Sequence, residues 1–70
     1  MKWIVSVQFS RAKAYHQFFS LLNRGMIKDT VMTNHSALYK LIEFETTTAP
    51  EEAKIKKMGS VVNVIIVEVK

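Results

Sequence analysis

The sequence contains no cysteine, only two glycines and only one proline. The lack of cysteine excludes disulfides, thiolate metal sites and cysteine nucleophiles together. Seventy residues, taken as a single domain spanning 1–70, bury only about 60% of the surface of the extended chain. Without covalent or metal cross-links, we expect the fold to depend on a compact apolar core, on a partner, or on both.

Long apolar runs and acidic residues are also scarce. The early apolar stretch at residues 4–7 is too short for a secretory signal, and the apolar run at 61–69 is too short to span a bilayer. We therefore expect a cytoplasmic protein with no membrane contact. Residues 1–35 carry five Lys or Arg and a single Asp, whereas residues 36–70 carry five Lys and five Glu. The net charge of +4 therefore belongs to the N-terminal half, where an anionic partner is expected to bind.

Motifs for catalysis are missing. The sequence has no glycine-rich phosphate loop, and its six acidic residues form no paired-carboxylate or Ser-His-Asp pattern. His16 and His35 have no third ligand at a metal-binding spacing, so we expect no metal, no cofactor and no enzymatic activity. A small ribonuclease that uses His35 or His16 as an acid–base residue is the least favoured alternative.

The N-terminal half predicts a strand followed by a helix. Residues 2–8 alternate in polarity and place Trp3, Val5, Val7 and Phe9 on one face. Ser10 is a suitable N-cap for a helix ending near Asn23 or Arg24, with Gly25 as its left-handed stop. The apolar stripe of this helix comprises Tyr15, Phe18, Phe19 and Leu22.

The remaining elements complete a β-α-β-β-α-β order. Strands are predicted over 26–33 and 37–45, with a turn at 33–36 in which Asn34 tolerates positive φ. Thr48 and Glu51 match a capping box for a second helix ending by Met58, and residues 61–69 form the last strand. This order predicts an α+β fold of the ferredoxin-like type, with two helices on one face of a four-stranded antiparallel sheet.

The C-terminal strand is apolar on both faces, interrupted only by Asn63 and Glu68. Its alternation separates a set of residues 65, 67 and 69 from a set of residues 62, 64 and 66. We assign the first set to the core and the second to the open face of the sheet. The predicted self-association surface is therefore Ile4, Leu41, Val62, Val64 and Ile66.

These observations favour a small non-catalytic interaction or regulatory module, such as an inhibitor, that forms a homodimer and binds a protein partner. The alternative is a basic nucleic-acid-binding protein, because one face of the first helix is basic and free of acids. The residues predicted to contact nucleic acid or an acidic partner are Arg11, Lys13, His16, Gln17, Ser20 and Arg24.

Overall fold

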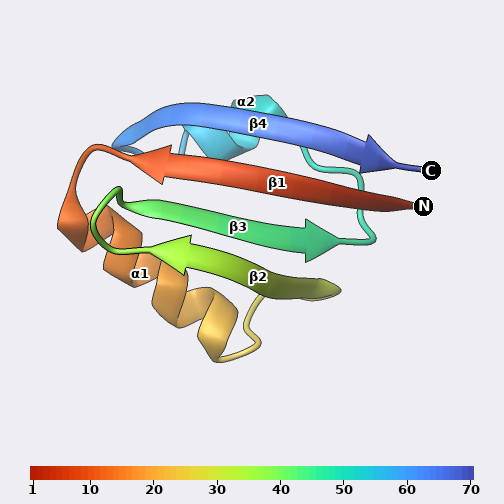
Figure 1. Cartoon of the computed structure of the whole chain (residues 1–70), viewed down its shortest axis with the longest axis horizontal. Helices are drawn as coiled ribbons and strands as arrows, with labels where there is room; N and C mark the ends of the chain where they lie inside the picture. The colour runs from red at the N-terminus through yellow and green to blue at the C-terminus, as the bar shows by residue number, and fades with distance from the viewer.

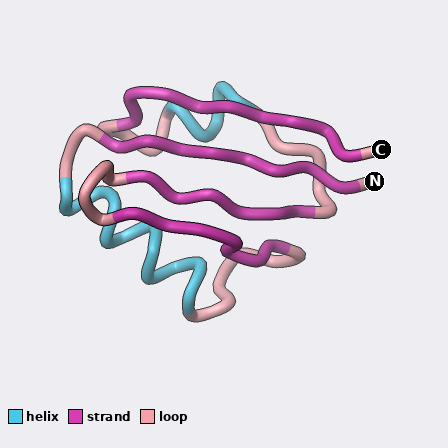
Figure 2. Tube along the Cα trace, viewed as in Figure 1, coloured by secondary structure: helices cyan, strands magenta, loops and turns pink.

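The computed structural model describes all 70 residues as one four-stranded sheet with two helices (Figure 1). The elements in chain order are β1 (Lys2–Phe9), α1 (Ala12–Asn23), β2 (Thr30–Ser36), β3 (Leu41–Thr46), α2 (Glu52–Lys56) and β4 (Val61–Val69). Both helices lie behind the sheet, α1 across β2 and β3 and α2 behind β4, and the two termini lie side by side (Figures 1 and 2).

The sheet is antiparallel throughout, with the strand order β2-β3-β1-β4. β1 and β3 are the inner strands, and β2 and β4 form the two edges. The predicted α+β class, the four-stranded antiparallel sheet and the two helices are confirmed. β1 pairs with a strand on each side, and its helix-side residues Val5 and Val7 are fully buried. The apolar valines of this strand suit its inner position, because they lie in the middle of the covered face.

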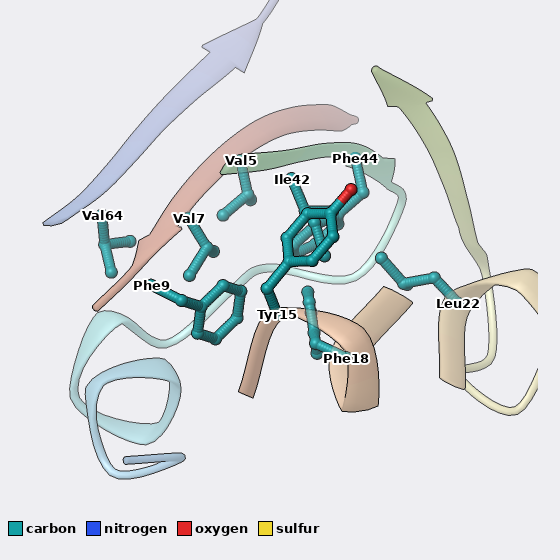
Figure 3. Close-up of a cluster of buried hydrophobic side chains, with 9 residues drawn as sticks. All are labelled: Val5, Val7, Phe9, Tyr15, Phe18, Leu22, Ile42, Phe44 and Val64. Atoms are coloured by element: carbon teal, nitrogen blue, oxygen red, sulfur yellow. The ribbon is translucent and has the colours of Figure 1, made fainter. Parts of the chain in front are cut away.

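The core lies between the sheet and α1 (Figure 3). Its nine buried residues are Val5, Val7, Phe9, Tyr15, Phe18, Leu22, Ile42, Phe44 and Val64. The Phe18 ring bridges the sheet, with its centroid 5.7 Å from that of Phe9 and 5.6 Å from that of Phe44. Trp3 shares this face, as predicted, but is only half-buried and lies outside the cluster that contains Val5, Val7 and Phe9.

The first helix follows the predicted stripe and stop. Tyr15, Phe18 and Leu22 are buried, and Gly25 takes φ +69° directly after the helix. The predicted N-cap is wrong: Arg11 occupies that position without a side-chain cap. The Ser10 hydroxyl instead donates to the Ser60 carbonyl at 3.3 Å and joins the start of α1 to the start of β4.

The hairpin between β2 and β3 lies later in the sequence than predicted. Ser36, assigned to the turn, ends β2, and residues 37–40 make the turn instead. The Ser36 hydroxyl accepts a hydrogen bond from the Tyr39 N–H, a local contact that stabilises a turn. Lys40 takes the left-handed conformation, with φ 54°, that was predicted for Asn34.

The second helix is a single short segment, Glu52–Lys56, with no buried residue. Glu51 is its N-cap and makes no side-chain cap, so the predicted Thr48–Glu51 capping box is absent. Two exposed ion pairs, Lys54–Glu51 and Lys56–Glu52, contribute at most a few tenths of a kcal/mol each. This helix is held chiefly by its contact with β4 and by Ile55, which packs against the core.

Candidate interaction surface

The register of β4 reverses the predicted assignment of its two faces. Val64 pairs with Val7 and Ile66 pairs with Val5, and paired residues of antiparallel strands share a face. Val64 and Ile66 therefore face the helices, and Val64 is only 9% exposed. The prediction that they face outward is wrong, because both sets of β4 are aliphatic and only the pairing with β1 distinguishes them.

Val62, the third residue of that predicted set, occupies an irregular position. Gln8 pairs with Asn63 and Phe9 with Val61, so the register shifts there and Val62 has no partner on β1. Such a shift is typical of a β-bulge, which leaves the extra residue without a partner in the ladder. Val62 is exposed at the start of the strand and belongs to neither regular face.

The open face of the sheet carries the opposite set of β4 residues. Ile65 and Val67 are 54% and 53% exposed, and Val67 lies directly opposite the half-buried Ile4 of β1. Together with Leu41 of β3, the aliphatic residues of this face are Ile4, Leu41, Ile65, Val67 and Val69. Of the residues predicted for self-association, the structure thus places Ile4 and Leu41 on the open face and not Val62, Val64 or Ile66.

The aliphatic residues are not spread evenly over the open face. Ile4, Ile65, Val67 and Val69 lie together on β1 and β4, and we call these four residues the aliphatic patch. The neighbouring part of the face is polar, because the Ser6 hydroxyl donates to the Glu43 carboxylate at 3.2 Å. The open face is therefore apolar toward the β4 edge and polar at its centre, where Ser6 and Glu43 lie.

A second polar contact, the ion pair between Lys2 and Glu45, borders the aliphatic patch near the N-terminus. The Lys2 ammonium lies 3.2 Å from the Glu45 carboxylate, and both side chains are partly exposed. On the β2 side, the Thr33 hydroxyl lies 3.4 Å from the other oxygen of Glu43. The two carboxylates of β3 are thus satisfied by neighbours on the same face, and burying them would require the removal of their remaining water.

The β4 edge exposes unpaired backbone groups. The Phe9 N–H donates to the Lys40 carbonyl, so odd-numbered residues of β1 point their backbone groups toward β3 and even-numbered residues point toward β4. The register then directs the backbone groups of residues 63, 65, 67 and 69 toward β1. Those of residues 64, 66 and 68 face away from the sheet, where no strand pairs with them.

The predicted basic surface lies on the outer side of α1. Arg11, Lys13, His16, Gln17 and Arg24 are exposed, and Ser20 is half-buried. The three ion pairs of the molecule involve only Lys2, Lys54 and Lys56, so the cations of α1 have no acidic partner. This surface therefore carries positive charge that no carboxylate of the molecule pairs with.

The two histidines lie around Tyr15. The His35 Nδ1 atom is 3.4 Å from the Tyr15 hydroxyl, and the His35 ring packs edge-on against Phe19 with centroids 4.9 Å apart. The His16 ring lies edge-on to Tyr15 with centroids 5.1 Å apart. No group of three or more His, Cys, Asp or Glu side chains lies together as a metal site. This aromatic grouping could not be predicted from the sequence pattern, because His35 is on β2 and Tyr15 on α1.

A groove of about 440 Å³ separates α1 from α2 on the other side of the sheet. Phe18, Phe44 and Ile55 supply apolar lining. The lining has no net charge, because it contains two lysines and two acidic residues: Lys28, Lys54, Asp29 and Glu51. The groove has the size of a small-ligand pocket, but its charges select no ligand class.

Comparisons with known proteins give no match: no family model, no curated protein and no solved structure is significantly similar to this chain. Neither helix has the length and apolar character that crossing a membrane requires.

Proposed function

We propose that this chain is a small non-catalytic interaction module that self-associates through its sheet and binds a protein partner, in a regulatory role such as that of an inhibitor. The observation that supports it is the aliphatic patch, whose two central residues, Ile65 and Val67, are more than half exposed. Contiguous exposed apolar surface on a small protein is typical of an interaction site. The patch adjoins an edge strand with unpaired backbone groups, which favours contact with another polypeptide.

Sedimentation velocity over a micromolar concentration series tests this proposal. We expect the wild-type chain to associate with rising concentration and Val67→Lys to shift the equilibrium toward the monomer. Val31→Lys is the matched control, because Val31 is also an exposed valine of the open face but lies on β2, beyond the polar residues. A wild-type chain that stays monomeric throughout, or equal effects of the two variants, would contradict the proposal.

We further propose that the fold is ferredoxin-like and that the protein acts in the cytoplasm. Two split β-α-β units support the fold assignment: β3 lies between β1 and β2, and β1 lies between β3 and β4. This topology serves many unrelated functions, so it does not by itself favour any of them. An experimental structure with a different helix placement would overturn the fold assignment.

Nucleic-acid binding through the outer side of α1 is the second candidate function. It is favoured by the exposed cations Arg11, Lys13 and Arg24, which lie within or next to α1 and make no ion pair. A salt series of RNA and DNA affinities tests it, because phosphate contacts release counterions and weaken as salt rises. Binding with no salt slope, or binding that survives Lys13→Glu combined with Arg24→Glu, would exclude this function.

A ribonuclease activity of His35 or His16 is the third candidate. The proximity of His35 to the Tyr15 hydroxyl supplies two groups that can exchange a proton, which is the single observation in its favour. Incubation of folded protein with RNA tests it directly. Cleavage that disappears in His35→Ala or in His16→Ala would support a ribonuclease, and intact RNA would exclude a ribonuclease.

A further inference from the structure

We infer that two copies of this chain pair their β4 strands antiparallel about a two-fold axis through Ile66, forming one continuous eight-stranded sheet. The inference rests on the self-association proposed above and specifies its geometry. The free edge of β4 supplies the hydrogen-bonding groups. Val64, Ile66 and Glu68 direct their backbone N–H and C=O groups away from β1, and these groups recur at every second residue.

The side chains of this edge do not block pairing. From Asn63 to Val69 the strand keeps an unbroken register with β1 and contains no proline and no glycine. Glu68 is the only charged residue of β4. Edge strands of soluble proteins are ordinarily protected by proline, bulges or charged side chains, and this regular segment has one charge and neither of the others.

The charge and the aliphatic residues together select the register. An axis through Ile66 places Glu68 opposite Val64 of the second copy, and Ile65 opposite Val67 of the second copy on the open face. An axis through Glu68 would set two carboxylates against each other and would leave few residues paired. The axis through Ile66 keeps the two Glu68 carboxylates apart. It also forms the cross-strand pair of Ile65 with Val67 once on each side of the axis.

Stacking of two open faces fits the structure less well. Glu43 and Glu45 lie on that face beside the aliphatic patch, within the area that a stacked partner would cover. Stacking would therefore remove partly hydrated carboxylates from water, at a desolvation cost. Edge pairing leaves both carboxylates where they are, since it extends the sheet from the opposite side of β1.

Edge pairing also changes the surface that a protein partner meets. The patch of each copy ends at β4, so the second copy continues it across the axis with its own Ile65, Val67 and Ile4. The result is one aliphatic stripe over the four central strands, β1-β4-β4-β1.

A proline substitution at the edge tests the geometry. The N–H of Glu68 faces away from β1, so Glu68→Pro removes no hydrogen bond within one copy, and the outward side of an edge strand accepts proline. In the dimer, the same change removes the N–H that donates to the Val64 carbonyl of the second copy, and the two-fold axis doubles the loss. We expect Glu68→Pro to weaken dimerisation by roughly tenfold or more.

Glu68→Ala is the matched control, because it removes the same charge and keeps the N–H. Sedimentation velocity gives the dissociation constant of each variant, and circular dichroism verifies that each is folded. A dimer weakened by Glu68→Pro but not by Glu68→Ala supports edge pairing. If wild type dimerises and both variants dimerise equally well, edge pairing is overturned while self-association stands; a strictly monomeric wild type overturns both.

Cross-linking examines the register independently of stability. The chain has no cysteine, so Ile66→Cys introduces one thiol per copy. At the axis, the Cα atoms of a hydrogen-bonded antiparallel pair lie about 5.5 Å apart, within the range for a disulfide. We expect rapid oxidation to a covalent dimer for Ile66→Cys and slow oxidation for Thr33→Cys on the β2 edge. Equal rates for the two folded variants would contradict this register.

Discussion

The two edges of the sheet differ in length, in polarity and in the position of their register shift, which lies within β2 but only at the start of β4. β2 has seven residues, its register is interrupted between Met32 and Asn34, and its exposed residues are largely polar. β4 has nine residues and is aliphatic along most of its length. Interruptions and polar side chains protect an edge from pairing with another chain. One edge of this small sheet is therefore protected, and the other is open to a partner.

The helices that cover these edges differ in the same direction. α1 has 12 residues and buries Tyr15, Phe18 and Leu22 over the β2 half of the sheet. α2 has five residues and buries none. Tyr15 and Phe19 of α1 contact His35 and so hold β2 against the helix. In α2, Ile55 is the main residue that packs against the core. The β4 edge thus combines the stronger tendency to pair with the weaker cover.

Opposite faces of β4 are predicted to respond very differently to the same charge. Val64→Lys places an ammonium in the core, and we expect a loss of about 3 kcal/mol or more of unfolding free energy. That loss is a large part of the roughly 4–10 kcal/mol expected for a 70-residue domain. Val67→Lys, on the exposed face, should change the stability by less than about 1 kcal/mol.

Urea denaturation followed by circular dichroism, at a protein concentration below the association range, measures both values. The low concentration matters because association would otherwise add to the apparent stability. Similar losses for the two lysine variants would mean that the register of β4 against β1 is not the one described. Loss of association by Val67→Lys, with its fold intact, would separate the two faces by function as well.

The two helices provide the next contrast. Leu22→Ala removes a buried side chain from α1, and we expect a cost of about 2–4 kcal/mol. Ile55→Ala removes a half-buried side chain from α2, and we expect about 1–2 kcal/mol. Chemical denaturation measures both, and native-state hydrogen exchange should show that α2 opens at a lower free energy than α1. Equal protection of the helices would contradict the weaker cover of the β4 edge.

The elements of the N-terminal half could be predicted because several signals agree. In α1, the apolar residues follow a helical period and Gly25 follows the last turn, so stripe and stop were both recognised. β1 alternates clearly, and its Val5 and Val7 are buried as predicted. The Ser10 cap failed because the helix begins later, with Arg11 as its N-cap. The Ser10 hydroxyl donates to the Ser60 carbonyl, 50 residues away in the sequence, and accepts no hydrogen bond from the first turn.

The faces of β4 could not be predicted because its sequence is symmetric in polarity. Val62, Val64 and Ile66 are as aliphatic as Ile65, Val67 and Val69, so alternation identifies two faces without saying which is buried. The bulge at Val62 sets the register of β4 against β1, and no residue type in the strand predicts a bulge at that position. The existence of an uncovered aliphatic surface was nevertheless predicted, with Ile4 and Leu41 correctly placed on it.

The smallest expected difference concerns the residues that lead into the two edge strands. Asp29 precedes β2 and Ser60 precedes β4, and both take φ 57°, a conformation that costs most residues energy. Aspartate tolerates this region better than serine does. Ser60→Gly should therefore stabilise the fold by about 0.5–1 kcal/mol, and Asp29→Gly by less.

Thermal unfolding of the two glycine variants measures this difference. The Ser60 substitution is a clean one, because its carbonyl accepts the hydrogen bonds from Ser10 and a glycine retains that carbonyl. A gain at Ser60 without change in the dissociation constant of the dimer would show that the entry to β4 is strained while its edge is unaffected. Destabilisation by Ser60→Gly would instead mean that the added freedom of the unfolded chain, next to Gly59, outweighs the relief of strain.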